Sequence, residues 1–279
     1  MINDRPTLLA LDFDGVLCDG LLEYFQTAWR TYCQLWSIPT GVSPEALAPL
    51  FYRTRPVIEI GWEMPVLIRA LVLGISETEI LQNWSQIAHN IITEEQLQAE
   101  IIGPHLDRVR DEWINTDLSG WFGLHRFYPG VIERIKPLIE GGFPVYIITT
   151  KEERFVRSLL QKQGVTIPEN QLFGKGYKRP KYAILRELLT QIEPTPHIWF
   201  IEDRLQTLFS VQQQPDLIVE THPILEETET RRGTSLRLFL ADWGYNIQRE
   251  RDLAAESSAI HLLSLSQFSQ DFSGWLTIK

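Results

Sequence analysis

The chain has 279 residues, 44% of them apolar, and a formal net charge of −10. Its length predicts one large domain with an insertion, and its acidic balance argues against nucleic acid or an anionic membrane surface as the main partner. Two cysteines provide no disulfide framework, and neither a signal peptide nor an apolar run long enough for a membrane span is evident. We therefore expect a cytoplasmic protein.

The first predicted element is a buried strand at 7–12, which ends in two acidic residues. The sequence from Leu8 to Gly15 reads LLALDFDG, so Asp12 closes the strand and Asp14 stands where the chain turns at a glycine. Open parallel sheets bind their ligands at the carboxyl ends of the strands. Two carboxylates at that edge repel each other unless a metal ion, a phosphorylated intermediate or a shared proton relieves the repulsion.

Between residues 20 and 126, helical periodicity replaces the strand pattern. We expect helices at Leu21–Trp36, Pro44–Phe51, Pro56–Leu73, Glu77–Ala88 and Glu94–Trp113. Because this all-helical module is inserted directly after the aspartate pair, we expect it to act as a cap domain that excludes water and selects the substrate.

Four charged residues stand out within the cap. Arg53 and Arg55 are candidates for contact with an anionic substrate. Glu59 and Glu63 lie four residues apart on a predicted helix and would therefore share one face. An exposed, solvated helix face explains the same charges, and the sequence leaves both interpretations open.

The rest of the chain alternates strands and helices. Near-continuous apolar runs predict buried strands at Pro144–Thr150, His197–Asp203, Leu236–Asp242 and Ala259–Leu265. Helical patterns occur at Gly130–Glu140, Glu152–Gln163, Pro180–Gln191, Arg204–Gln213 and Asn246–Glu256. This alternation predicts an α/β fold: a Rossmann-like, doubly wound parallel sheet formed by residues 1–19 and 127–279, with the helical cap at 20–126. The polar stretch 214–234 is expected to be a solvated excursion between strands.

Polar side chains close several of the predicted strands at their carboxyl ends. They are Asp12, Asp14, Thr149, Thr150, Glu202, Asp203 and Asp242. Lys181 opens the helix that precedes the third of these strands. A carboxylate pair, a hydroxyl, a lysine and a second acidic pair together form a set suited to phosphoryl transfer.

Each member of this set has an expected role. Asp12 attacks phosphorus, and Asp14 protonates the leaving oxygen and later activates water. Thr149 and Lys181 bind the phosphoryl oxygens, and Thr150 is a further candidate for substrate contact. Mg²⁺ is expected to bind oxygens of four residues, namely the carboxylates of Asp12, Asp203 and Glu202 and the backbone carbonyl of Asp14.

Simpler interpretations exist for single members of the set. Thr149 could cap the helix that follows it, and the pair Glu202 and Asp203 could favour a helix N-terminus. Asp242 also fits an ordinary turn. The six histidines are scattered without ligand spacing, which argues against zinc, and no residue is assigned to an organic cofactor.

In this order, the residues resemble the motifs of haloacid dehalogenase superfamily hydrolases with a helical C1-type cap. The four motifs are similar to Asp12-Phe13-Asp14-Gly15-Val16, Ile148-Thr149-Thr150-Lys151, Lys181 and Glu202-Asp203. Two softer segments also agree, Tyr128-Pro129-Gly130-Val131 and Asp242-Trp243-Gly244-Tyr245-Asn246. More narrowly, Glu202-Asp203-Arg204-Leu205 and Trp243-Gly244-Tyr245-Asn246 resemble uncharacterised cyanobacterial and plant-type members.

The resemblance implies a Mg²⁺-dependent phosphatase that hydrolyses a small phosphorylated metabolite through an aspartyl-phosphate. Asp14 favours phosphate esters because a halide leaving group would need no proton. The cap contains no lysine, which argues against phosphonate hydrolysis through a Schiff base. A phosphomutase and a non-catalytic binding or regulatory protein are the alternatives, and the substrate and the oligomeric state stay open.

Two details of the sequence complicate the resemblance. Thr207 stands where many relatives have an acidic residue, four positions after the metal-binding aspartate, so metal binding is expected to depend on Glu202. Lys175 and Lys178 lie close to Lys181 and compete with it as the phosphate-binding lysine. We favour Lys181 because it opens a helix directly after a proline.

Overall fold

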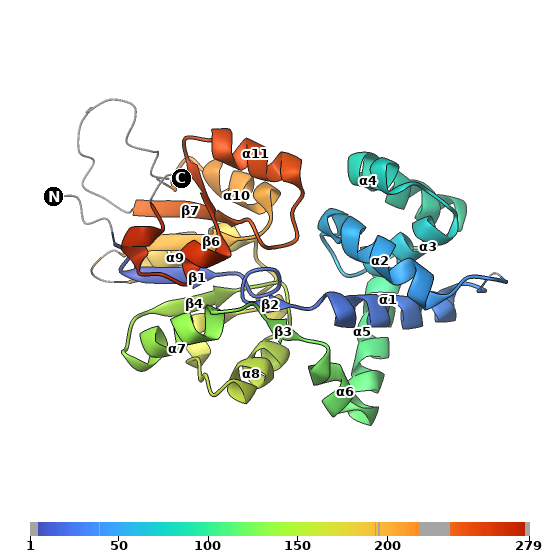
Figure 1. Cartoon of the computed structure of the whole chain (residues 1–279), viewed down its shortest axis with the longest axis horizontal. Coiled ribbons are helices and arrows are strands. Elements are labelled where there is room, and N and C mark those ends of the chain that lie inside the picture. The colour runs from blue at the N-terminus through green and yellow to red at the C-terminus, as the bar shows by residue number, and fades with distance from the viewer. Residues whose placement is uncertain (1–4, 39, 193, 195, 218–234, 277–279) are drawn as a thin grey trace. The chain divides into compact units, whose positions relative to one another are not determined.

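The structure of the protein, a computed structural model, describes residues 5–38, 40–192, 194, 196–217 and 235–276. The chain divides into two compact units (Figure 1). One consists of Met1–Asp19 and Phe127–Lys279, and the other of Gly20–Arg126. We refer to them as the α/β unit and the helical unit. Among the described residues, no helix is both long enough and apolar enough to cross a membrane.

The α/β unit is built on a parallel sheet with the strand order β5-β4-β1-β6-β7-β8. The strands are β1 (Leu8–Leu11), β4 (Val145–Ile148), β5 (Leu172–Phe173), β6 (His197–Glu202), β7 (Ser235–Ala241) and β8 (Ile260–Leu263). The five strands predicted for this sheet are all present, and the predicted doubly wound α/β class is confirmed. The edge strand β5 was not predicted, because two residues are too few to produce a period-2 pattern.

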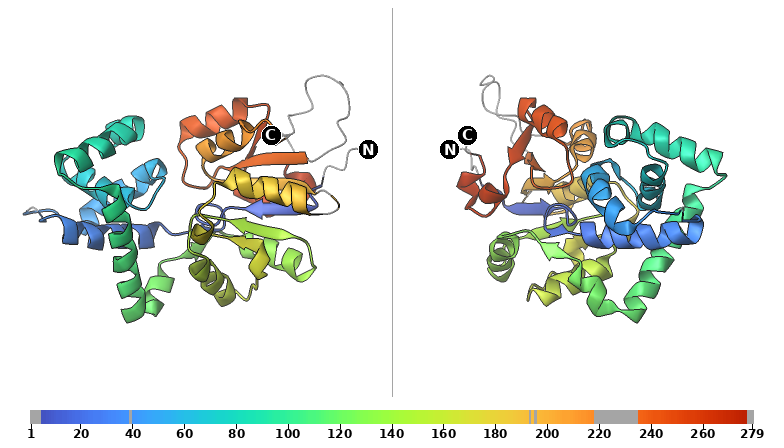
Figure 2. Two further views of the ribbon diagram at one scale, coloured as in Figure 1. Left: turned by 180° about the vertical axis from the view of Figure 1, so that it is seen from behind. Right: turned by 45° about the vertical axis from the view of Figure 1, so that its right-hand side comes forward.

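Alternate residues of the central strands face two separate layers of the core. Leu8 and Ala10 of β1 point to the face that is covered by α9 (Lys181–Gln191) and α10 (Leu205–Gln212). The yellow helix α9 lies across the sheet when the molecule is seen from behind (Figure 2). On β6, Trp199 lies opposite Leu9 of β1 and faces the other layer. It packs there against Trp275, with 5.5 Å between the ring centroids. Both faces are apolar, which explains the near-continuous apolar strands.

The α/β unit contains further helices and 3₁₀ turns among its described residues. They are α7 (Val131–Glu140), α8 (Glu153–Lys162), α11 (Gln248–Glu256) and α12 (Leu265–Phe268), with 3₁₀ turns η2 (Glu169–Gln171), η3 (Lys175–Tyr177) and η4 (Phe272–Gly274). Gly130 precedes α7 with φ +83°, a conformation that costs a glycine little. Ser264 caps α12 together with the side chain of Gln267. The short strands β2 (Cys18–Asp19) and β3 (Arg126–Phe127) pair with each other.

The helical unit contains six α-helices among its described residues. They are α1 (Leu21–Leu35), α2 (Pro44–Thr54), α3 (Glu63–Val72), α4 (Glu77–Glu94), α5 (Ala99–Thr116) and α6 (Leu118–Gly123). Helix α1 packs against α2, α3 and α5. Ser43 and Ser76 cap α2 and α4 by accepting bonds from the backbone N–H groups of Ala46 and Glu79, at 3.3 and 3.2 Å.

The predicted helix at 56–73 is wrong in its first part. A 3₁₀ turn, η1 (Arg55–Val57), is followed by irregular chain, and α3 begins only at Glu63. The Glu63 carboxylate accepts bonds from the backbone N–H groups of Glu59 and Ile60 at 2.6 and 2.7 Å. The Glu63 side chain thus binds the backbone of the irregular segment before α3. Because Glu59 lies outside the helix, the two glutamates do not share a helix face.

Two further sequence predictions differ from the structure or lie outside it. Helix α4 continues to Glu94, and α5 starts at Ala99, because Gln96 adopts φ +54° and interrupts the helical path. Most of the polar stretch at 214–234 lies outside the described residues, which resume at Ser235.

Candidate active site

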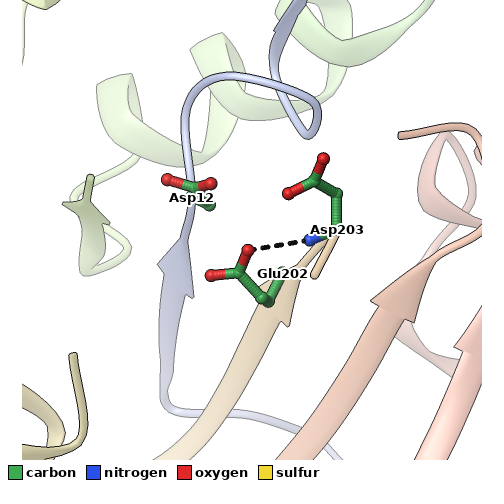
Figure 3. A group of neighbouring side chains, drawn as sticks. All are labelled: Asp12, Glu202 and Asp203. Carbon is green, nitrogen blue, oxygen red and sulfur yellow. Dashed lines mark hydrogen bonds between the residues drawn. The ribbon is translucent and has the colours of Figure 1, made fainter. Parts of the chain in front are cut away.

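Three buried carboxylates meet at the carboxyl ends of β1 and β6. These strands are parallel neighbours with Leu11 opposite Ile201, so the next residues, Asp12 and Glu202, also come side by side. Asp203 follows directly, and each of the three residues offers an oxygen within 4.8 Å of the other two. Figure 3 shows the three side chains pointing into one space from the two strand ends. Three of the residues predicted from the sequence to form one site therefore lie together in the folded chain.

Lys181 supplies a positive charge to this cluster. Its Nζ lies 2.8 Å from Asp12 Oδ1 and 2.7 Å from Glu202 Oε2. The residue is the first of α9 and follows Pro180, which has extended backbone and ends the preceding turn. Lys175 and Lys178, in contrast, are exposed on that turn. Of the three competing lysines, Lys181 is the one whose ammonium contacts the carboxylates.

The electrostatics of the cluster favour the addition of a cation. Burial raises the pKa of Asp12 to about 7; Lys181 opposes this rise, and Glu202 adds to it. Burial likewise raises the pKa of Glu202 to about 6. Burial alone would lower the pKa of Lys181, but Asp12 and Glu202 together outweigh burial and raise it. The ammonium therefore stays charged, while the carboxylates retain an unfavourable excess of negative charge.

Backbone groups fix the two acidic residues at the end of β6. Glu202 Oε1 accepts bonds from the N–H groups of Asp203 and Arg204, each at 3.1 Å. Asp203 Oδ2 accepts a bond from the N–H of Tyr245 at 2.7 Å. A Cβ on Gly15, which has φ +88°, would lie only 2.0 Å from that same Oδ2. Glycine is thus required beside the aspartate pair for both conformation and space.

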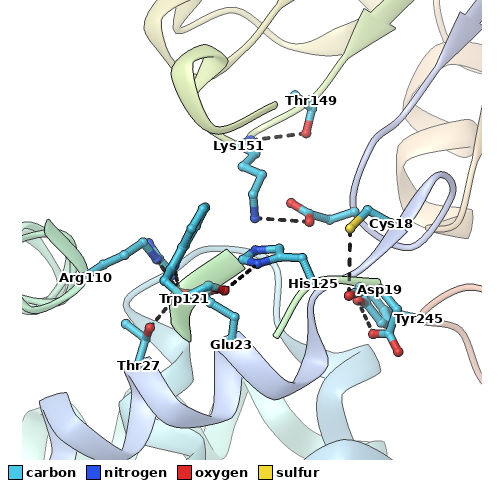
Figure 4. A network of polar contacts seen from close by, with 11 residues as sticks. Cys18, Asp19, Glu23, Thr27, Arg110, Trp121, His125, Thr149, Lys151 and Tyr245 are labelled. Carbon is cyan, nitrogen blue, oxygen red and sulfur yellow. Dashed lines mark hydrogen bonds and ion pairs between the residues drawn. The ribbon is translucent and has the colours of Figure 1, made fainter. Parts of the chain in front are cut away.

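Asp14 contacts a lysine from the segment that follows β4. Lys151 Nζ lies 3.2 Å from Asp14 Oδ1, and both side chains are largely buried. Thr149 is buried after β4, and its Oγ1 accepts a bond from the backbone N–H of Lys151 at 3.2 Å (Figure 4). The N-cap of α8 is Glu152, so capping does not explain Thr149. Thr150, the next residue, is exposed.

The other candidate residues lie elsewhere in the chain. Arg53 is exposed in the helical unit and forms an ion pair with Glu77 at 2.7 Å. Arg55 is buried in the same unit and donates a bond to the Ile58 carbonyl at 3.0 Å. Asp242 follows β7, where its N–H donates to the Leu263 carbonyl at 3.0 Å. A role of the two arginines in substrate binding stays a prediction.

The carboxylate cluster fits a hard divalent cation. Its possible ligands are carboxylate oxygens, which Mg²⁺ prefers, and they converge within the spacing that one ion can bridge. All three residues are buried, so solvent cannot relieve their mutual repulsion as it does for surface acids. Burial is the main cause of the raised pKa values of Asp12 and Glu202, and the neighbouring carboxylates Glu202 and Asp203, respectively, add to the rise. The donor set therefore suits a hard divalent cation.

Comparison with known proteins finds solved structures of similar fold, at low sequence identity. No family model matches the sequence, and a search of curated proteins found no match. A predicted phosphoglycolate phosphatase from Haemophilus somnus is 14% identical over 93% of this chain and 95% of its own, with a TM-score of 0.51. A predicted phosphatase from Clostridium acetobutylicum is 13% identical over 94% of this chain and 95% of its own, with a TM-score of 0.53.

A haloacid dehalogenase-like family hydrolase from Streptococcus pneumoniae is also similar, with 12% identity, coverage of 93% of this chain and 94% of its own, and a TM-score of 0.50. These likenesses show that the protein has a haloacid dehalogenase-like fold, in which the helices α1 to α6 form an inserted helical unit. The narrower resemblance to cyanobacterial and plant-type members stays a prediction.

Sequence reasoning did not assign two contributors to this site. Lys151 was noted after the threonine pair but received no role, although a lysine directly after a strand end was the available signal. The backbone N–H of Tyr245 has no sequence signal of its own. Only the unexplained segment 242–246 pointed to that region of the chain.

Proposed function

We propose that this protein is a Mg²⁺-dependent phosphatase that hydrolyses a small phosphorylated metabolite through an aspartyl-phosphate at Asp12. The observation that carries the proposal is the meeting of Asp12, Glu202 and Asp203 with Lys181 at one edge of the sheet. An ordinary structural ion pair needs one acid for each base. Here buried acids accumulate at the position where ligands of parallel sheets bind.

The first chemical step is attack by a carboxylate oxygen of Asp12 on phosphorus. The new bond joins Asp12 to the phosphoryl group, and the bond from phosphorus to the ester oxygen breaks. Asp14 donates its proton to that leaving oxygen, so the alcohol departs neutral. Lys181, whose Nζ contacts the Asp12 carboxylate, is proposed to attract the phosphoryl oxygens.

The second step regenerates the enzyme. Asp14, now ionised, takes a proton from water, and the water oxygen attacks phosphorus and displaces Asp12. Thr149 follows β4, and its Oγ1 accepts a hydrogen bond from the Lys151 N–H. We propose that the Thr149 hydroxyl donates a hydrogen bond to a phosphoryl oxygen. Lys151 contacts Asp14 and is proposed to hold it in place between the two steps.

The carboxylates of Asp12, Asp203 and Glu202 and the backbone carbonyl of Asp14 are proposed to hold Mg²⁺. When bound, the ion offsets the repulsion between a carboxylate nucleophile and an anionic phosphoryl group.

We propose that the cap, residues 20–126, selects the substrate, and that Thr150, Arg53 and Arg55 are candidates for contact with it. One structural neighbour is described as a predicted phosphoglycolate phosphatase, so phosphorylated hydroxy acids belong in a substrate panel beside sugar phosphates and nucleotides. A small phosphorylated metabolite is the class that the fold and the buried site favour.

The test is release of inorganic phosphate from such a panel and from p-nitrophenyl phosphate, with Mg²⁺ or with a chelator. We expect release that requires Mg²⁺ and that falls by about 10³-fold or more in Asp12→Asn, because the nucleophile is lost. Asp252→Asn is the matched control, since Asp252 is exposed on α11. Activity of Asp12→Asn at the level of this control would contradict the proposal.

A further inference from the structure

A short turn after β7, Trp243–Asn246, contacts the candidate site from a strand that contributes no carboxylate to it. The N–H of Tyr245 donates to Asp203 Oδ2 at 2.7 Å. A Cβ on Gly244 would lie 2.3 Å from Asp203 Cβ and 2.5 Å from the Gly15 carbonyl oxygen. The turn therefore packs directly against Asp203, a candidate metal ligand, and only glycine fits at position 244.

Asn246 holds this turn in place. It is buried, and its Nδ2 donates to the Asp203 carbonyl at 2.9 Å and to the Ala241 carbonyl at 2.8 Å. These two bonds join the end of β7 to the end of β6. An asparagine amide has two N–H donors, and here both donate to backbone carbonyls beside the site.

Arg251 in turn fixes Asn246. Its Nη1 donates to both the backbone carbonyl and Oδ1 of Asn246, each at 2.9 Å. With Oδ1 committed to a guanidinium, the amide cannot flip, and its Nδ2 must face Asp203. Arg251 stands on α11, so this helix is connected to Asp203 through two successive hydrogen bonds.

The same turn also contacts the loop that follows Asp14. Trp243 Nε1 donates to the Val16 carbonyl at 3.1 Å. The Tyr245 hydroxyl donates to Asp19 Oδ1 at 2.9 Å (Figure 4). The turn therefore binds the chain after β1 and the chain after β6 at once. These are the two segments that supply Asp12 and Asp203.

We propose that Asn246, held by Arg251, is a positioning residue that orients the Asp203 carboxylate for a divalent cation. This inference rests on the proposed function. Without the Asn246 amide, the turn can move away from Asp203, and the carboxylate loses the Tyr245 N–H that fixes its rotation. Residues behind metal ligands typically change metal affinity by 10–100-fold when substituted.

The test measures Mg²⁺ and Mn²⁺ binding to the metal-free full chain by calorimetry, without substrate. We expect the Kd to rise by about 10-fold or more in Asn246→Ala and by about 3-fold or more in Arg251→Ala. Arg249→Ala is the matched control, because it removes the same charge from an exposed position of α11. Loss of a positive charge alone would tighten cation binding, so weaker binding in Arg251→Ala has the sign of lost positioning.

Phosphate release at increasing Mg²⁺ provides a second readout. If Arg251→Ala has only a positioning defect, high Mg²⁺ returns its kcat toward that of Arg249→Ala. If the substitution damages the fold in general, high Mg²⁺ does not restore kcat. If Asn246→Ala fails to fold, Arg251→Ala decides the question. Wild-type Kd values in the folded variants would overturn the inference alone, and a wild-type protein that binds neither ion would overturn the proposed function with it.

Discussion

The two units each bury charged side chains, but they balance the charge differently. In the helical unit, Glu23 is fully buried, and its Oε1 accepts bonds from Arg110 at 2.7 Å, Thr27 at 2.6 Å and Trp121 at 3.2 Å (Figure 4). A fully buried carboxylate here meets a largely buried guanidinium, which also pairs with the partly exposed Asp107 at 3.6 Å. In the part of the α/β unit that the structure describes, Lys151 and Lys181 contact a site that holds four carboxylates, those of Asp12, Asp14, Glu202 and Asp203.

This difference separates a structural ion pair from a site prepared for a ligand. A paired buried charge needs nothing further, and breaking it leaves its partner desolvated and uncompensated. An excess of buried carboxylates costs stability and is tolerated where another cation completes the set. The raised pKa of Asp12 shows that this cost is present in the α/β unit.

The largest expected effect comes from breaking the balanced pair. Arg110→Met should lower the free energy of unfolding by about 3–5 kcal/mol, because Glu23 stays buried without its guanidinium. Urea denaturation measures this change. Arg108→Met is the matched control, since Arg108 is exposed on the same helix. Similar losses in the two variants would show that the Glu23–Arg110 pair is not a structural element.

The unbalanced cluster should respond with the opposite sign. Asp12→Asn should raise the free energy of unfolding of the metal-free protein at pH 8 by up to about 4 kcal/mol, since each unit of raised pKa represents about 1.4 kcal/mol. The amide is neutral and of similar size, so it removes the cost of burying a charged carboxylate without leaving a cavity. A destabilised Asp12→Asn would show that the carboxylates are compensated already.

The metal-free wild type should also lose stability as the pH rises. The folded-state pKa of Asp12 is raised from 3.8 to about 7, so between these values the folded state binds more protons than the unfolded state. Stability is therefore full below about pH 4 and declines through pH 7, and Asp12 contributes a loss of about 2–3 kcal/mol between pH 5 and pH 8. Denaturation at several pH values measures this slope, which should be shallower in Asp12→Asn.

The smallest effect is expected at the surface of the helical unit. Arg53→Ala removes an exposed ion pair with Glu77 and should leave the melting temperature unchanged, since solvent screens such pairs. Its KM for the best substrate is the informative quantity. An increase in KM at unchanged stability would give Arg53 the substrate role that the sequence suggested, and an unchanged KM would remove it.

Much of the site could be predicted because parallel strands bring their carboxyl ends to one edge. Asp12, Thr149, Glu202 and Asp203 each follow an apolar run, and the register of neighbouring strands does the rest. Lys181 could be placed because a proline before it signals a helix start. Its side-chain direction, and so its two carboxylate contacts, became clear only in the folded chain.

Other features depend on contacts that no local pattern encodes. Glu63 looked like a mid-helix residue, yet α3 begins at Glu63, and its carboxylate accepts bonds from two backbone N–H groups of the irregular chain before it. The Tyr245 N–H reaches Asp203 only because the turn after β7 folds back over β6. A backbone donor carries no sequence signature, so Asn246 and Gly244 were visible only as a segment without an assigned purpose.

The most direct test of the central claim, that excess negative charge prepares this site for a cation, is the melting temperature at pH 8 with and without Mg²⁺. Ligands that bind only the folded state stabilise it by mass action. Wild type should melt lower than Asp12→Asn without Mg²⁺ and should gain several degrees when Mg²⁺ is added, while Asp12→Asn gains little. An equal gain in both proteins, or no gain in the wild type, would contradict the claim.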